Sequence, residues 1–119
     1  IQNLVDDSGN LPIITLDPEL ENLFSDLVSK SQDPREIALE PTLAEKVFIA
    51  TKSAVRSAEE RGLSAVLVVS PLLRVWVSEL LRRSTKDLTV LSYAEIPDDQ
   101  AIEAITTIST NVDTQNVNN

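Results

Sequence analysis

Residues 64–93, SAVLVVSPLLRVWVSELLRRSTKDLTVLSY, contain two strand-like runs separated by a helical one. The first run, at 65–69, is apolar at every position, which is typical of a central strand covered by helices above and below. Ser70 and Pro71 then supply an N-cap and a first helical residue. The inward positions of this helix are Leu73, Val77, Leu80 and Leu81, with Trp76 beside them. A second strand, at 88–93, completes the unit, and the right-handed crossover rule predicts that the two strands are parallel.

Upstream of this unit, the sequence predicts a first strand and a first helix. The cluster DDSGN at 6–10 favours a turn, in which a glycine or asparagine takes a positive φ. The residues before the turn and the strand at 11–16 therefore form a hairpin, or the end of one element and the start of the first full strand. Asp17 is placed to cap a helix that begins at Pro18. The residues that repeat with helical spacing are Leu20, Leu23, Phe24, Leu27 and Val28.

Between the first helix and the 64–93 unit, we predict a short strand and a long helix. The segment REIALE at 35–40 is consistent with a second strand. Thr42 stands three residues before Glu45, a capping-box spacing, and Gly62 is suited to end the helix in the left-handed region. The narrow buried stripe of this helix is Leu43, Val47, Ala50, Ala54 and Ala58.

The last element, AIEAITTIST at 101–110, fits two patterns. Its apolar and polar residues alternate as in a strand, whereas Asp98 is placed to cap a helix that contains Ile102 and Ile105. We favour an edge strand, because Thr106, Thr107 and Ile108 are good strand formers. The polar residues that follow lack periodicity and are expected to be disordered.

These elements predict one α/β subdomain over residues 1–109 and a disordered tail over 110–119. The expected order is β-α-β-α-β-α-β, a small and largely parallel sheet of about four strands with helices packed on it, and a possible extra edge strand. The chain begins at Ile1 within a strand-like run, so we expect a fragment of a longer protein.

The composition argues against several function classes. The chain has no histidine and no cysteine, which removes the commonest general base, the commonest transition-metal ligand and the thiol nucleophile. The net charge of −9 argues against a nucleic-acid partner. All ten cations lie within residues 30–86, where the net charge is +3, whereas residues 1–29 and 87–119 each carry −6. The longest apolar run, at 65–69, is too short to cross a bilayer.

Ligands of parallel sheets usually bind at the carboxyl ends of the strands, where the sequence places Asp17, Glu40, Ser70 and residues 93–99. The first three are better explained as helix starts beside a proline. Ser70 also lacks both a histidine base and the glycines of a nucleophile elbow. The chain's two glycines do not lie in a loop that could wrap a phosphate.

Two surface groups remain as candidates. Glu95, Asp98 and Asp99 could hold Mg²⁺ or Ca²⁺, but we favour a solvated turn after Pro97, because acidic turns are common and no ligand spacing is present. The basic residues Arg74, Arg82, Arg83 and Lys86 could dock an acidic partner, although a solvated helix end is the more ordinary explanation. For Trp76 we favour core packing over a contact surface. We predict no catalytic residue, cofactor or metal ligand.

The run from Ala65 to Gln100 resembles the FlhA (FHIPEP) family, the large export-gate protein of flagellar and related type III secretion systems. The resemblance rests on the strand followed by Ser70, Pro71, Leu73 and Arg74, on the helix end at 80–83, and on LSYAEIP at 91–97. LPIITLDPELE and IALEP upstream are similar to the preceding strand and helix starts of that family. The sequence departs from the family pattern after Gln100.

The resemblance implies a non-enzymatic subdomain at the C-terminal end of the export gate's cytoplasmic region, on the cytoplasmic side of the bacterial inner membrane. Its implied partners are other subdomains and copies of the same protein in a ring, export-apparatus proteins and substrate–chaperone complexes. No binding residues are carried over, because the family's chaperone-docking surface lies mainly in other subdomains. The alternative is a Mg²⁺-dependent receiver-like or phosphoryl-transfer domain that uses Asp17, Asp98 and Asp99, which sheet order alone suggests.

Overall fold

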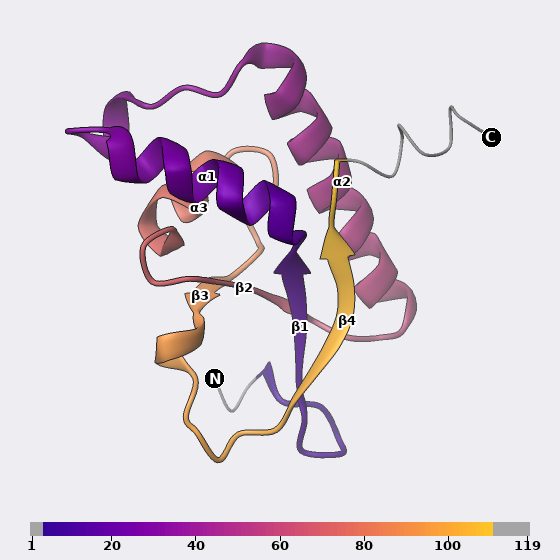
Figure 1. The fold of residues 1–119 in the computed structure, drawn as a ribbon. Coiled ribbons are helices and arrows are strands. Elements are labelled where there is room, and N and C mark those ends of the chain that lie inside the picture. Colours follow the sequence, from indigo (N-terminus) through magenta and orange to yellow (C-terminus); the bar gives the residue numbers. More distant parts are fainter. Residues whose placement is uncertain (1–3, 111–119) are drawn as a thin grey trace.

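The computed structural model describes residues 4–110. Four parallel strands form one sheet in the order β3-β2-β1-β4 (Figure 1). The strands are β1 (Leu11–Leu16), β2 (Val66–Val69), β3 (Val90–Ser92) and β4 (Ile102–Ile108). Three α-helices and two 3-10 turns connect them: α1 (Pro18–Lys30), η2 (Pro34–Glu36), α2 (Pro41–Glu60), α3 (Arg74–Leu81) and η3 (Tyr93–Glu95). The predicted α/β class with a small parallel sheet is confirmed.

The first strand and helix form as their sequence predicts. Asp6 organises the turn before β1, because its carboxylate accepts the backbone N–H groups of Ser8 and Asn10, each at 2.9 Å. Gly9 takes a φ of 85°, a conformation that glycine adopts without steric cost. Asp17 caps α1 by accepting the backbone N–H of Glu19 at 3.2 Å. The helix buries Leu20, Phe24 and Val28 on one side.

The strand predicted at 35–40 is wrong. Asp33 caps η2 by accepting the backbone N–H of Arg35, and an extended segment without strand pairing then leads to α2. Both edges of β1 are occupied by β2 and β4, so this segment has no partner beside β1. Ile37 and Leu39, its two larger apolar side chains, instead pack partly buried against the helical core.

Helix α2 has the predicted extent but a different cap. Glu40 accepts the backbone N–H groups of Thr42 and Leu43, both at 3.1 Å, so the predicted box between Thr42 and Glu45 is replaced by a carboxylate cap one residue before Pro41. The helix ends before Gly62, whose φ of 72° confirms the predicted stop. Its fully buried positions are Val47, Thr51, Ala54 and Ala58.

Helix α3 begins later than the sequence predicts. Ser70, Pro71 and Leu72 form a turn in which the N–H of Leu73 donates to the Ser70 carbonyl at 3.0 Å, and the α-helix starts at Arg74. The Ser70 side chain caps nothing. Leu73 is fully buried, so its packing places the start of the helix.

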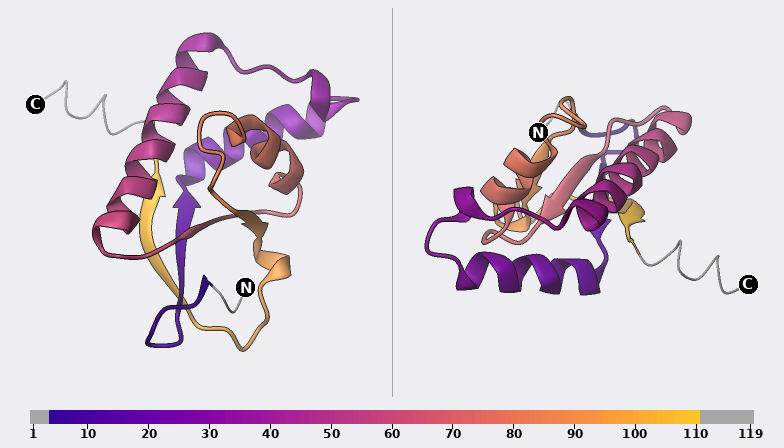
Figure 2. Two further views of the ribbon diagram at one scale, coloured as in Figure 1. Left: turned by 180° about the vertical axis from the view of Figure 1, so that it is seen from behind. Right: turned by 90° about the horizontal axis from the view of Figure 1, so that it is seen from above.

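The α-helices pack against one face of the sheet, which corrects the prediction that β2 is covered by helices on both faces. One core cluster joins residues of all three α-helices to alternate strand residues such as Ile14, Leu67 and Val69. On the opposite face, Ile13 and Val66 pack against Leu4 and Ile96. Figure 2 shows the irregular segments before β1 and between β3 and β4 from which these last two residues come. The chain moves from β1 to β2 to β3 in one direction, and right-handed crossovers then place every connecting helix on the same side.

The edge strand predicted near the C-terminus is confirmed as β4. It runs parallel to β1 from the pair Leu11–Ile102 to the pair Leu16–Ile108, with an irregularity at Ile13–Ile14. The four-stranded sheet therefore contains this strand in place of the one predicted at 35–40. The disordered tail predicted over 110–119 falls on residues outside the described range, apart from Thr110, as do residues 1–3.

Candidate functional site

Two of the four candidate positions at strand ends serve as helix caps. Asp17 follows β1 and caps α1, whereas Glu40 caps α2 at a place where no strand ends. The backbone N–H groups of Thr42 and Leu43 lower the pKa of Glu40 below its usual range, because they stabilise the charged carboxylate. Both carboxylates therefore have a structural role that the sequence predicted for their positions.

Ser70 follows β2, and its hydroxyl oxygen is buried without a hydrogen-bond partner in the described part of the chain. A serine nucleophile requires a base within hydrogen-bonding reach. No described side chain lies at that distance, so the geometry does not support a nucleophilic role for Ser70.

Glu95 follows β3, and its carboxylate forms hydrogen bonds with other residues of the fold. Its Oε1 accepts the backbone N–H of Ser92 at 2.9 Å and the Nε of Arg74 at 2.6 Å. The Ser92 N–H, with a further contribution from Arg74, holds the pKa of Glu95 below its usual range. This ion pair connects η3 to the first turn of α3. Glu95 is therefore an intramolecular ion-pair partner of α3.

Asp98 and Asp99 lie at the other end of the sheet from Asp17. They belong to the turn closed by Gln100, whose side-chain amide donates to the Gly9 carbonyl beside the start of β1. The backbone N–H of Asp17 instead donates to Ile108 at the far end of β4, and seven residues of strand span roughly 23 Å. These three carboxylates do not share one site, so the structure does not support the Mg²⁺-dependent alternative.

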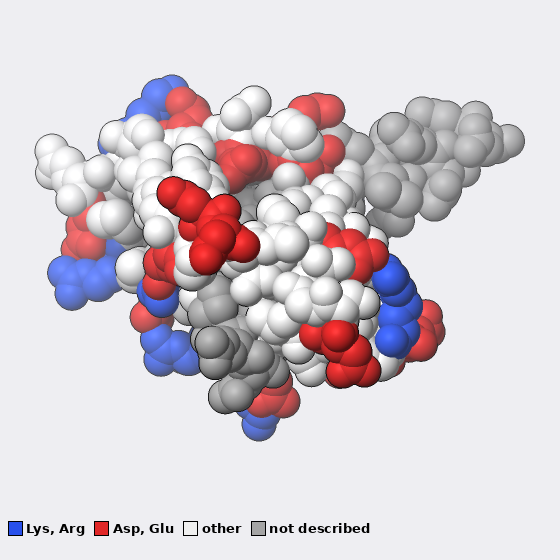
Figure 3. All heavy atoms as spheres, turned by 90° about the horizontal axis from the view of Figure 1, so that it is seen from below, with Lys and Arg blue, Asp and Glu red and all other residues white. Residues whose placement is uncertain are grey.

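Figure 3 shows acidic side chains in separate groups on the face seen from below. Among the described residues, no three Asp or Glu side chains are arranged to hold a metal ion. Asp98 and Asp99 are exposed, as a solvated turn requires. That prediction is confirmed for these two residues.

The four basic residues near α3 do not form one patch. Arg74 pairs with Glu95 at the start of the helix, and Arg82 pairs with Glu79 at 2.5 Å near its end. Arg83 is exposed and makes no ion pair within the described range, whereas Lys86 lines a hollow next to α2. Arg83 and Lys86 are therefore two exposed cations after α3 that make no ion pair in the described part of the chain.

Trp76 belongs to the core, as predicted. The residue is 93% buried, and its ring packs edge-on against that of Phe24, with centroids 4.9 Å apart and planes at 71°. The surface next to it is apolar, because Leu72 and Val75 are 52% and 65% exposed. A groove of about 480 Å³ lies between α3 and the segment from the end of α1 to η2. Its apolar walls are Val28, Ile37, Leu72, Val75, Trp76 and Leu80.

Neither Leu72 nor Val75 is singled out by a motif in the sequence. The signal was present, because residues 72–81 contain seven apolar side chains and one helical face can bury only part of them. The core packing predicted for Trp76 is confirmed, and the apolar residues left over on the surface are the two aliphatic ones.

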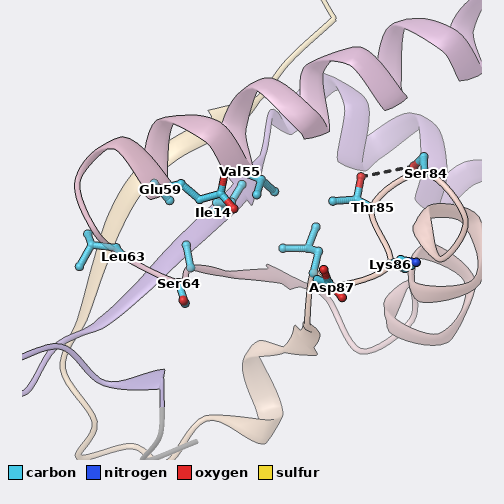
Figure 4. Close-up of a pocket in the computed structure, with 12 residues that line it drawn as sticks. Ile14, Val55, Glu59, Leu63, Ser64, Ser84, Thr85, Lys86 and Asp87 are labelled. Atoms are coloured by element: carbon cyan, nitrogen blue, oxygen red, sulfur yellow. Dashed lines mark hydrogen bonds between the residues drawn. The ribbon is translucent and has the colours of Figure 1, made fainter.

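A second hollow, of about 410 Å³, lies at the amino-terminal ends of β2 and β3 (Figure 4). The end of α2 forms one wall and the loop at 84–88 forms another. Its charged groups are Glu59, Lys86 and Asp87, and none of the ion pairs in the described part of the chain joins them. Ligands of parallel sheets usually bind at the opposite end of the strands, so the position of this hollow does not indicate a ligand site.

The FHIPEP family matches residues 1–101. The chain belongs to the FHIPEP family. The resemblance inferred from the SPLLR and LSYAEIP motifs is therefore confirmed. Within the residues described for this FHIPEP chain, no helix combines the length and apolarity that a membrane span requires.

Relatives of this FHIPEP chain carry the name flagellar biosynthesis protein FlhA. That of Buchnera aphidicola subsp. Acyrthosiphon pisum is 36% identical over 110 residues, which cover 92% of this chain and 15% of the relative. That of Escherichia coli K12 is 35% identical over 96 residues, which cover 81% and 13% respectively. The chain thus spans only 13–15% of the length of these relatives.

Solved structures share the fold of this FHIPEP chain. Nonameric SctV-C of EPEC gives a TM-score of 0.73 at 14% identity, over 90% of this chain and 32% of that one. The Shigella flexneri MxiA protein gives a TM-score of 0.67 at 24% identity, over 90% and 33% respectively.

Proposed function

We propose that this chain is the C-terminal subdomain of the cytoplasmic region of a flagellar protein-export gate. It lies on the cytoplasmic side of the bacterial inner membrane, where export substrates arrive. The family match over residues 1–101 is the observation that carries this proposal. The flagellar assignment is supported by relatives of 31–36% identity that are named flagellar biosynthesis proteins.

We propose further that the subdomain acts by binding rather than by catalysis. Its partners are other subdomains and copies of the same gate protein, export-apparatus proteins, and substrates with their chaperones. The structural neighbour SctV-C of EPEC is nonameric, which supports contacts between copies. The use of Asp17, Glu40 and Glu95 as caps and ion-pair partners also favours a binding role.

Deletion of the coding segment for residues 1–110 from the parent gene in its native host tests this function. We expect the shortened protein to accumulate in the membrane fraction while secreted flagellar proteins disappear from the medium. A matched strain with Asp98→Asn and Asp99→Asn should export normally. Normal export by the deletion strain would contradict the proposal.

A further inference from the structure

One side of α3 continues as a single stripe past the end of the helix. Leu72, Val75, Trp76, Glu79 and Leu80 line the groove at spacings of three and four residues. Arg83, three residues beyond Leu80, extends the stripe, because the backbone stays helical at Arg82 and the Thr85 N–H donates to the Leu81 carbonyl at 2.9 Å.

The groove is long enough for a partner helix. Residues 72 to 80 span roughly 12 Å along the axis of α3, which equals about two turns of a second helix beside it. The opposite wall comes from Val28, Ile37 and the 3-10 turn η2. Both walls lack a free strand edge, so an extended peptide would leave its own backbone N–H and C=O groups unpaired against apolar side chains. A helix satisfies these groups internally.

The charges around the groove favour an acidic partner. Its two charged lining residues are already compensated, since Arg35 binds Asp33 and Glu79 binds Arg82. Arg83 makes no ion pair within the described range. The same holds for Lys46, Lys52, Arg56 and Lys86, but among these cations Arg83 is the one that continues the groove-lining stripe of α3. An acidic helix is therefore repelled by the net charge of −9 and attracted at the unpaired cations, of which Arg83 is the one in line with the groove.

We propose that the groove between α3 and η2 binds an amphipathic helix of a partner protein, with aliphatic side chains against Leu72, Val75 and Trp76 and a carboxylate at its acidic end against Arg83. The inference rests on this surface alone. Binding to the groove is tested on this chain by itself, without export, so a failure of this proposal is distinguishable from a failure of the proposed function.

The chain contains a natural probe of this groove, because Trp76 is its single tryptophan and forms part of the lining. The ligand probe is a synthetic helical peptide of about 18 residues, with leucines at helical spacing and glutamates at one end. A matched peptide has lysines in place of the glutamates. We expect the acidic peptide to shift the Trp76 emission saturably, with a Kd of roughly 10–100 μM.

Three variants test the contacts. Val75→Asp should weaken binding of the acidic peptide at least about tenfold. Arg83→Glu should reverse the preference, so that the lysine peptide binds better than the acidic one. Ile49→Asp, at a 58% exposed apolar position on α2 outside the groove, should leave binding unchanged.

Three outcomes would overturn the proposal. The first is an emission that stays constant up to millimolar acidic peptide, and the second is equal binding by wild type and Val75→Asp. The third is sedimentation that shows a dimer of the wild type and a monomer of Val75→Asp, which would assign the groove to a second copy of this chain.

Discussion

The two sides of α3 have similar composition and opposite surroundings. Leu73 and Val77 are buried in the core, and so is Trp76 apart from the edge that lines the groove, whereas Leu72 and Val75 remain more than half exposed beside the groove. Apolar character alone therefore does not separate a residue that holds the fold together from one that is free to bind a partner. The difference lies in what each side chain contacts.

Truncation of one buried and one exposed residue of this segment tests the difference directly. Trp76→Ala should lower the free energy of unfolding by about 3–5 kcal/mol, because it leaves a cavity against Phe24. Val75→Ala should change it by less than about 0.5 kcal/mol. Urea unfolding followed by far-ultraviolet circular dichroism measures both, and equal losses would contradict the assignment of the two sides.

The starts of α1 and α3 provide a second pair of residues whose stabilising contributions should differ. Asp17→Ala should cost about 1 kcal/mol of stability, because it removes the cap of α1. Ser70→Ala should leave stability unchanged or raise it, because the buried Ser70 hydroxyl has no partner among the described residues. Thermal melting of the two variants tests whether Asp17→Ala loses more stability than Ser70→Ala. A larger loss for Ser70→Ala would show that its hydroxyl caps α3 after all.

A smaller effect is expected from the pH dependence of Glu40 and Glu95. Both carboxyl groups have lowered pKa values in the folded chain, so their stabilising contribution is present above the unfolded pKa, near 4.3, and is lost as the pH falls through the folded values. Glu95→Gln should therefore reduce the loss of thermal stability between neutral pH and acid. An unchanged pH profile would mean that the bonds to Ser92 and Arg74 do not persist in solution.

The smallest effect is expected at the acidic turn. Asp98→Asn together with Asp99→Asn should leave the melting temperature nearly unchanged, because both side chains are exposed. Arg74→Ala, which breaks the ion pair with Glu95, is the matched comparison and should cost more. If the double variant loses more melting temperature than exposed surface substitutions usually do, the turn makes stabilising contacts of its own.

The elements predicted correctly from the sequence are those whose local signals agree with their packing. Asp17 and Pro18 start a helix whose apolar stripe faces the core, and Gly62 ends one where a left-handed residue is required. The run at 65–69 is apolar on both faces and becomes β2, although only one face is covered by helices. Apolarity reports burial and does not say what provides the cover.

The errors arise where tertiary contacts override a local signature. Ser70 and Pro71 have the same signature as Asp17 and Pro18, but the burial of Leu73 moves the start of α3 by three residues. Ile37 resembles a strand residue, yet it packs against the helices because no strand edge is free beside β1. The groove could not be predicted from the sequence either, because its second wall includes Ile37 from the segment that was expected to be a strand.

Export by the parent protein is the most direct test of the proposal that this subdomain acts through the groove between α3 and η2. The parent gene should carry Leu72→Asp with Val75→Asp in one strain, and Asp98→Asn with Asp99→Asn in another. We predict that the first protein accumulates normally but secretes little flagellar protein, while the second secretes at the wild-type level. Full secretion by the first strain would contradict the account.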